Sequence, residues 1–404
     1  MKCGLLGRTL KHSFSPLIHS YLGEYDYALF ETEPEDLADF LLQGDWDGLN
    51  VTMPYKKTVI PYLDELTPIA RQLGAVNTIL RRNGKLVGHN TDYRGFHALL
   101  LRSGLSPAGK KCLVLGSGGA SAVAKAALEE LGGNVVIISR NGENHYGNLE
   151  RHRDAAIIVN ATPVGMYPNN GETPVCLDLF QSLEGVLDLI YNPANTQLLL
   201  DAQSRDLVTM NGLWMLVAQA KEAAEWFTDS SITDSKIRDI HASLSAQMQN
   251  IILIGMPGCG KSAIGQRLST LLGRKFVDTD SRIEALAQKT ISEIFAQDGE
   301  DVFRQWETKV LTDCTKESGL VIATGGGCVT KPENHPLLKQ NSHIIWLQRQ
   351  IHLLPNNGRP LSQAGDLSVM YQARKPLYQH LAQNTIENNG SLDHAVNAIV
   401  EVCK

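Results

Sequence analysis

The stretch Ile251–Ser262, with the sequence IILIGMPGCGKS, decides the fold of the last third of the chain. An apolar run leads into the pattern GxxxxGKS, and the helix-forming segment SAIGQRLSTLL follows, which is the order strand, glycine-rich turn, helix. In such a turn backbone N–H groups converge on phosphate oxygens, and the helix N-terminus adds positive potential. Lys261 can then reach the terminal phosphates, and the Ser262 hydroxyl can ligate Mg²⁺. We therefore predict an ATP or GTP site made by Gly258, Cys259, Gly260, Lys261, Ser262 and Ala263.

Length and composition favour a cytoplasmic protein of several domains. The 404 residues exceed one ordinary core, so we expect two or three compact units. The seven cysteines form no CxxC pair, which predicts reduced thiols and no zinc site. No apolar run approaches the roughly 20 residues of a membrane span, and the N-terminus lacks a signal-peptide core.

Charge is spread unevenly along the chain. Residues 1–249 carry 21 Lys and Arg against 28 Asp and Glu, whereas residues 250–404 carry 16 against 15. Neither part has the basic stripe of a nucleic-acid binder, so a few placed cations must meet any anionic ligand. We predict small-molecule substrates and infer no nucleic-acid, membrane or obligatory protein partner.

A second glycine cluster lies in residues 111–140, which read as strand, turn, helix, strand. Its turn is a variant of the dinucleotide fingerprint, with small Ser121 in the place of the third glycine. The next strand ends in an arginine where a NAD site usually carries an acid, although an arginine after a strand is also a common surface residue. We predict that NADP(H) binds at Gly116, Ser117, Gly118, Gly119, Ala120, Ser139, Arg140 and Asn141.

Reduction of a carbonyl also needs a proton donor, and the first 92 residues offer two candidates. Lys56 falls in the first turn of a helix that we expect over residues 55–66, and Asp92 stands at the start of another helix. Taken alone, Lys56 also fits a solvated lysine and Asp92 a helix N-cap. Spacing does not settle their role.

The segments HSFSP, NVTMPYK, AVNT, HNTD, GSGGAS, NATPVGM and GLWMLVAQA occur in the order found in shikimate dehydrogenases. The chain resembles that family over nearly all of residues 1–245. The resemblance implies an α/β substrate domain formed by residues 1–92 and 212–247, with a Rossmann NADP domain, residues 93–211, inserted between them.

The same resemblance assigns residue roles. It implies that Lys56 and Asp92 are the catalytic pair, and that the substrate is held by Ser13, Ser15, Thr52, Asn77, Asp92, Tyr191 and Gln219. Such hydroxyl and amide groups discriminate a polyhydroxylated ring by pairing with its oxygens. Asn144 and His145 stand where the family often has a second basic residue, so selectivity for NADP over NAD stays open.

Residues 250–404 resemble shikimate kinase, which implies a P-loop domain with a parallel sheet, like that of nucleoside-monophosphate kinases. In FVDTD, Asp278 and Asp280 are expected at a strand end with both side chains on one side. The resemblance implies that Asp278 serves Mg²⁺. It implies that Asp280 holds shikimate hydroxyls and acts as the base or orienting group.

Further kinase residues follow from the same resemblance. Arg304 and Glu307 lie three apart on an expected helix, a spacing typical of a surface ion pair. In the family the matching arginine grips the substrate carboxylate and the glutamate fixes it. The resemblance adds Arg359 in a lid that closes on the phosphates, and further substrate contacts at Gly325, Gly326, Gly327 and Arg374. A second lid arginine that many members carry is missing here.

Together the two resemblances predict a bifunctional enzyme of chorismate and aromatic amino-acid biosynthesis. The first part would reduce 3-dehydroshikimate to shikimate with NADPH, and the second would phosphorylate the new 3-hydroxyl with ATP and Mg²⁺. The alternative is a quinate or shikimate dehydrogenase that prefers NAD, joined to a kinase-like domain that senses a nucleotide or metabolite without turnover.

Overall fold

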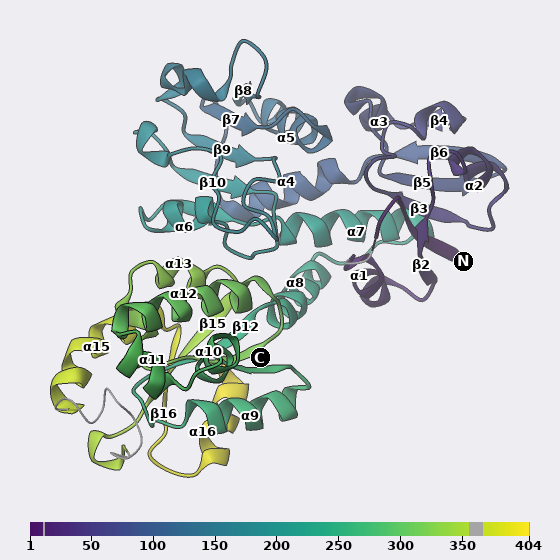
Figure 1. The fold of residues 1–404 in the computed structure, drawn as a ribbon. Helices are drawn as coiled ribbons and strands as arrows, with labels where there is room; N and C mark the ends of the chain where they lie inside the picture. The colour runs from purple at the N-terminus through teal and green to yellow at the C-terminus, as the bar shows by residue number, and fades with distance from the viewer. Residues whose placement is uncertain (11–12, 355–366, 404) are drawn as a thin grey trace. The chain divides into compact units, whose positions relative to one another are not determined.

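The computed structural model describes residues 1–10, 13–354 and 367–403, so the predicted lid residue Arg359 lies outside the described residues. The chain divides into two compact units, and three separate β-sheets are formed (Figure 1). The first unit comprises Met1–Val164, Thr173–Tyr191 and Asp201–Ser243. The second unit comprises Gly165–Glu172, Asn192–Leu200 and Leu244–Lys404.

The first sheet is mixed and has the order β2-β1-β3-β5-β6-β4. Its strands are β1 (Lys2–Gly7), β2 (Asp26–Glu31), β3 (Gly48–Val51), β4 (Glu65–Leu66), β5 (Thr78–Arg82) and β6 (Lys85–His89). Strands β3, β5 and β6 pair antiparallel, and the other pairs are parallel. Its helices are α1 (Ser15–Leu22), α2 (Leu37–Gln43) and α3 (Pro68–Leu73). Helix α7 (Leu213–Thr228) packs against this sheet. Its Phe227 ring lies so close to Gly48 of β3 that a Cβ at Gly48 would be only 2.6 Å from the ring.

The second sheet, also in the first unit, is fully parallel in the order β11-β10-β9-β7-β8. Its central strands are buried except for Lys111 at the start of β7, as the near-continuous apolar runs predict. Its strands are β7 (Lys111–Leu115), β8 (Asn134–Ile138), β9 (Ile157–Asn160), β10 (Gly185–Asp188) and β11 (Val208–Met210). The helices beside it are α4 (Asp92–Ser103) and α5 (Gly119–Glu130) (Figure 1), and α6 (Gln197–Gln203) precedes β11 in the chain.

The third sheet lies in the second unit and is parallel in the order β13-β14-β12-β15-β16. Its strands are β12 (Asn250–Ile254), β13 (Phe276–Asp278), β14 (Val321–Ala323), β15 (Ser342–Gln348) and β16 (Asn384–Glu387). Helix α8 (Ser235–Met248) precedes β12. The helices that follow are α9 (Lys261–Leu272), α10 (Thr279–Ala287), α11 (Ile291–Gln297), α12 (Glu300–Lys316), α13 (Asn334–Lys339), α15 (Leu367–Leu381) and α16 (Leu392–Val402).

The predicted α/β class and the parallel sheet around the P-loop are confirmed, but two local expectations are wrong. Residues 55–64 form turns and one 3₁₀ turn, Ile60–Tyr62, and Glu65–Leu66 form β4. A helix cannot continue through Pro61, because this residue has no N–H to donate and its ring would clash with the carbonyl one turn earlier. Asp280 lies in the first turn of α10 and not on a strand, so strand alternation does not place it beside Asp278.

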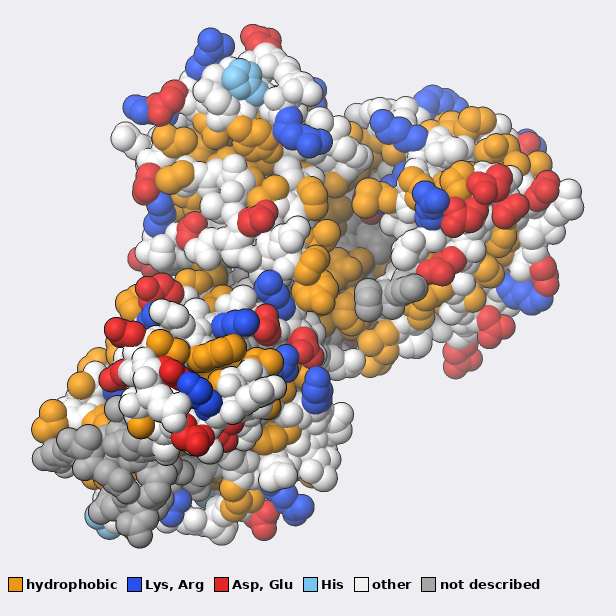
Figure 2. Space-filling view, in the orientation of Figure 1, with side chains coloured by type: hydrophobic (Ala, Val, Ile, Leu, Met, Phe, Trp, Pro, Cys, Tyr) orange, Lys and Arg blue, Asp and Glu red, His pale blue; other side chains and the backbone are white. Residues whose placement is uncertain are grey.

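On the face shown in Figure 2, Lys and Arg side chains are interspersed with Asp and Glu side chains. All seven cysteines are free thiols. Across the described ranges, no helix has the length and apolar character that crossing a bilayer requires.

Candidate active sites

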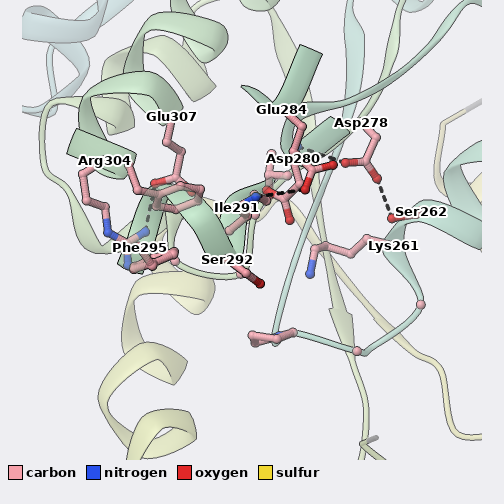
Figure 3. A pocket seen from close by; sticks show the side chains of 18 of the residues that line it. Lys261, Ser262, Asp278, Asp280, Glu284, Ile291, Ser292, Phe295, Arg304 and Glu307 are labelled. Carbon is pink, nitrogen blue, oxygen red and sulfur yellow. Dashed lines mark hydrogen bonds and ion pairs between the residues drawn. The ribbon is translucent and has the colours of Figure 1, made fainter. Parts of the chain in front are cut away.

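The second unit contains a cavity of about 480 Å³ at the carboxyl ends of β12, β13 and β14. This is the edge at which parallel sheets commonly bind ligands. Figure 3 shows the charged side chains that converge on it from α9, α10 and α12. Predicted residues that line it are Gly258, Gly260, Lys261, Ser262, Ala263, Asp278, Asp280, Arg304, Glu307, Gly325, Gly326, Gly327 and Arg374.

The turn between β12 and α9 has the backbone geometry that glycine allows. Gly258 and Gly260 have φ values of 79° and 98°, in the left-handed region. The ammonium of Lys261 is buried and donates to the carbonyl oxygens of Gly255 and Met256, at 2.8 and 3.0 Å. Cys259 is fully buried and is not among the residues that line the cavity. Its carbonyl accepts a 2.7 Å bond from Asn388, a supporting residue that the sequence did not reveal.

Ser262 and Asp278 form an oxygen pair that suits a divalent cation. The Ser262 hydroxyl donates to Oδ2 of Asp278 at 2.5 Å, and Oδ1 of Asp278 accepts from the backbone N–H groups of Asp280 and Ser281. The described residues contain no cluster of three His, Cys, Asp or Glu that could hold a metal alone. A hydroxyl and a carboxylate are oxygen ligands of the kind that Mg²⁺ takes, with water and phosphate oxygens as its other ligands.

The opposite wall of the cavity carries a partly buried ion-pair network. Arg304 donates to Glu307 and to Glu300, each at 3.0 Å, and the Glu307 side chain is fully buried. Burial raises the pKa of Glu307, and the attraction of Arg304 opposes this shift. Burial acts to lower the pKa of Arg304, but the two glutamates outweigh it and raise the pKa, so this guanidinium stays charged. Arg374 also lines the cavity and donates to the Gly326 carbonyl at 3.1 Å.

The run Gly325–Gly327 is needed for close packing, not for flexibility. A Cβ at Gly325 would lie 2.7 Å from Oε1 of Glu307 and 2.9 Å from Oδ1 of Asp280. A Cβ at Gly327 would overlap the Arg304 guanidinium, at 2.6 Å from Nη2. The absence of side chains here therefore lets the charged groups approach the backbone of this turn.

Several lining residues were not anticipated from the sequence. Glu284 follows Asp280 by one turn of α10, and Ile291 and Phe295 share a face of α11, so helical spacing was the available signal. Phe295 packs on Phe303, with ring centroids 4.7 Å apart, and gives the cavity an apolar wall. The full unanticipated set is Pro257, Glu284, Ile291, Ser292, Phe295, Phe303 and Thr324.

In the first unit, the structure brings Lys56 and Asp92 together. Lys56 lies in the turns after β3, and Asp92 is the first residue of α4, yet Nζ and Oδ2 are 2.5 Å apart. Their side chains are 30% and 15% exposed, so a ligand could still reach the pair. The Lys56 carbonyl also accepts from Val76 N at 2.7 Å, which fixes this turn against the segment leading to Asn77.

Of the other predicted dehydrogenase residues, Ser15 begins α1 and Gln219 lies in α7, whereas the rest lie outside helices and strands. Ser13 and Ser15 are joined by a 3.2 Å bond from Ser15 N to Ser13 Oγ. Phe14 between them packs edge-on against the Tyr191 ring, with centroids 6.3 Å apart. Thr52 directly follows β3, next to the Lys56 turn, and its N–H donates to the Leu6 carbonyl. Asn77 and Gln219 both contact Thr91, the residue before Asp92.

The second glycine cluster forms the turn between β7 and α5. Gly116 has φ of 108° and Gly118 is the N-cap of α5, so Ser117, Gly119 and Ala120 lie in the turn and first helical positions. Ser121 is buried, and its Oγ lies 3.2 Å from where a Gly116 Cβ would be, so the turn and the first turn of α5 pack closely.

Beyond β8, the Ser139 hydroxyl donates to the Asn141 carbonyl at 2.6 Å. Burial raises the pKa of Tyr146, and the positive charge of Arg140 opposes this rise. The Arg140 cation is therefore close to Tyr146, which follows the loop of residues 139–145. Asn144 and His145, in the same loop, bond to His152 and to Gly147 N.

Comparison with known proteins separates two regions of the chain. Residues 5–79 match the family model for the shikimate dehydrogenase substrate binding domain. A shikimate dehydrogenase (NADP(+)) of Clostridium perfringens is 34% identical over 266 residues, which cover 60% of this chain and 98% of that protein. The chain belongs to the shikimate dehydrogenase family. Residues 257–404 match the family model for shikimate kinase, so a shikimate kinase domain of the P-loop type follows the dehydrogenase part.

Solved structures of this dehydrogenase family cover the same region. Shikimate 5-dehydrogenase of Thermus thermophilus in complex with NADP(H) and shikimate is 31% identical, with a TM-score of 0.56. It matches 60% of this chain and 99% of that one. Quinate dehydrogenase of Corynebacterium glutamicum in complex with NAD has the same coverage and TM-score at 27% identity. Both resemblances predicted from the sequence are therefore confirmed at the level of the family.

Proposed function

We propose that this chain catalyses two consecutive reactions, the NADPH-dependent reduction of 3-dehydroshikimate to shikimate and the ATP-dependent phosphorylation of shikimate to shikimate 3-phosphate. One observation carries the proposal. A shikimate dehydrogenase region with a close Lys–Asp pair and a shikimate kinase region with a phosphate-binding turn occur in one chain. The product of the first reaction is the substrate of the second.

In the reductase reaction, NADPH would supply the hydride when bound. Lys56 would donate the proton to the ketone oxygen, and Asp92 would orient its ammonium and keep it charged. The 2.5 Å separation and partial exposure of the pair support this assignment. Ring hydroxyls and the carboxylate would be bound by Ser13, Ser15, Thr52, Asn77, Tyr191 and Gln219.

The proposed cofactor preference rests on Arg140. A cation after β8 suits a 2′-phosphate, whereas an acid would suit the free ribose of NAD. The alternative, a quinate or shikimate dehydrogenase that prefers NAD, finds support in the likeness to a quinate dehydrogenase in complex with NAD.

In the kinase reaction, Arg304 and Arg374 would bind the shikimate carboxylate, with the Gly325–Gly327 backbone alongside. The charged, buried Arg304 is already oriented by Glu307 and Glu300, so little ordering is left for binding. Asp280 would orient the attacking hydroxyl and accept its proton.

At the nucleotide end of the cavity, Lys261 and the backbone N–H groups of Gly258–Ala263 would hold the phosphates of ATP, and Arg359 is proposed to join them. Ser262 and Asp278 would hold Mg²⁺, which when bound offsets the charge of the transferred phosphoryl group. A sensor domain without turnover would not need Asp280 in the same cavity as Lys261 and Arg304, so their shared cavity favours catalysis.

Separate assays of the purified chain test this proposal. NADPH and NADH are compared as reductants of 3-dehydroshikimate, with quinate and NAD tested in the reverse direction. ADP formation is followed with shikimate, ATP and Mg²⁺. The proposal expects preference for NADPH and shikimate-dependent ADP release. A preference for NADH with quinate, or ATP binding without ADP release, would favour the alternative.

A further inference from the structure

A buried polar network lies directly behind the dehydrogenase pair. Asn77, Thr78 and Thr91 are at most 3% exposed, and Thr91 directly precedes Asp92. The Thr91 hydroxyl lies 3.0 Å from Nδ2 of Asn77 and 3.3 Å from Oε1 of Gln219. It therefore joins two predicted substrate-binding amides that are 142 positions apart in the sequence.

Thr91 is the N-cap residue of α4, but it does not act as a cap. A threonine at this position commonly accepts a bond from the second or third N–H of its helix. Here the side chain makes no such bond, and the backbone is already helical, with φ of −84° and ψ of −14°. The hydroxyl therefore bonds to Asn77 and Gln219, and it does not accept a bond from the first N–H groups of α4.

The bonds of Thr91 define how both amides are turned. Its backbone N–H donates to Oδ1 of Asn77 at 2.7 Å, and Nδ2 of Asn77 donates to the Thr91 hydroxyl. The hydroxyl proton of Thr91 has two acceptors at 3.3 Å, Oδ1 of Asn77 and Oε1 of Gln219. Because Oδ1 of Asn77 already accepts from the Thr91 N–H and the Thr78 hydroxyl, we assign this proton to Gln219, whose Nε2 donates to the Leu216 carbonyl at 2.9 Å. Both amide oxygens are therefore occupied, and each amino group keeps one N–H that no bond within the described ranges uses.

The backbone at Gln219 is held independently of Thr91. On the same side of α7, Glu222 pairs with His89 at 3.0 Å, and Trp226 stacks on the His89 ring with centroids 4.1 Å apart. A Cβ at Gly95 would lie 2.9 Å from Cβ of Gln219, so α4 and α7 are in direct contact. The side-chain torsions of Gln219 are then its remaining freedom, and the bond to Thr91 restricts them.

We propose that Thr91 is a positioning residue of the reductase site: it turns Asn77 and Gln219 so that each presents an N–H donor to an oxygen of the polyhydroxylated substrate. This inference rests on the proposed reduction of 3-dehydroshikimate. A ring with several oxygens is recognised through fixed donors, because a rotated amide would offer an oxygen where the site needs an N–H.

The matched variants Thr91→Val and Thr91→Ser test this role in the full chain. Valine keeps the shape and removes the hydroxyl, so the KM for 3-dehydroshikimate should rise about tenfold or more, the effect of roughly one lost hydrogen bond. The kcat should change less than about threefold and the KM for NADPH should stay the same, because Lys56, Asp92 and the β7–α5 turn keep their contacts. Serine keeps the hydroxyl, so its KM should stay within about twofold of wild type. The kinase rate of each preparation measures the amount of intact chain.

Two results would overturn the inference. One is a Thr91→Val chain whose KM for 3-dehydroshikimate stays within twofold of wild type, or that loses kcat and NADPH binding to the same degree as substrate binding. The other is a Thr91→Ser chain whose KM for 3-dehydroshikimate rises about tenfold or more, a result that overturns the inference even if the valine variant does not fold. A wild-type chain that reduces no 3-dehydroshikimate would instead contradict the proposed function itself.

Discussion

The substitution Gly327→Ala tests whether the glycine run makes room for the Arg304 guanidinium. The new methyl would lie 2.6 Å from Nη2 and 2.8 Å from Cζ of Arg304, whereas favourable contacts between such atoms are about 3.5–4.0 Å. The guanidinium must therefore withdraw by about 1 Å. Gly327 has φ of −99° and ψ of −3°, which alanine adopts readily, so backbone strain is not involved.

The expected magnitude follows from how Arg304 is held. Its side chain is 12% exposed and bonded to Glu307 and Glu300 at 3.0 Å each, so it cannot withdraw without loosening one charged bond or its hold on the substrate. Loss of one hydrogen bond to a charged group costs about 1.5–3 kcal/mol. The KM for shikimate should therefore rise about 10- to 150-fold, while the KM for ATP changes little.

The assay follows ADP release at saturating Mg-ATP over a range of shikimate concentrations. Gly390→Ala is the matched control, because a Cβ there meets no atom within 4 Å and its φ lies outside the left-handed region. NADPH-dependent reductase activity in each preparation reports that the chain is intact. A Gly327→Ala chain with a shikimate KM within twofold of wild type, or an equal rise in Gly390→Ala, would refute the reasoning.

Three further predictions concern the pair, the cofactor and acid stability. Lys56→Ala should lower the reductase kcat by roughly 10²–10⁴ and leave ADP release intact, whereas Lys261→Ala should do the reverse; joint loss from either change would contradict two independent sites. Arg140→Asp should lower kcat/KM for NADPH relative to NADH by about tenfold or more. An unchanged ratio would show that Arg140 does not bind the 2′-phosphate. Burial lowers the pKa of His19 to about 3 in the folded chain, so the unfolded chain binds the extra proton below pH 6.5 and stability falls as pH falls. Between pH 6.5 and 5 the free energy of unfolding should drop by about 2 kcal/mol more in wild type than in His19→Gln, measured by urea unfolding; equal slopes would be inconsistent with a buried neutral His19.

Local patterns were sufficient for the parts of the fold that depend on local physics. The P-loop turn, the βαβ unit and the pairing of Arg304 with Glu307 each involve residues within one strand–turn–helix or one helical turn. Spacing alone could not distinguish a surface ion pair from the partly buried network that forms, because burial of Glu307 depends on the distant Gly325 turn.

The remainder depends on contacts between residues far apart in the sequence. Lys56 was assigned to a helix that Pro61 prevents, yet its contact with Asp92 arises because the turn after β3 and the start of α4 meet at one end of the sheet. The packing of Phe14 on Tyr191 likewise has no counterpart in local spacing. Thr91 resembles an ordinary helix cap in the sequence, and only its neighbours across the fold reveal another use.

The most direct test of the central claim supplies the purified chain with 3-dehydroshikimate, NADPH and Mg-ATP in one reaction and follows NADPH, ADP and the phosphorylated product. We predict that ADP appears only when NADPH is present, that it follows NADPH oxidation toward equal amounts, and that the product is shikimate 3-phosphate. Oxidation of NADPH without any 3-phosphate, or ADP formation from 3-dehydroshikimate in the absence of NADPH, would contradict the account.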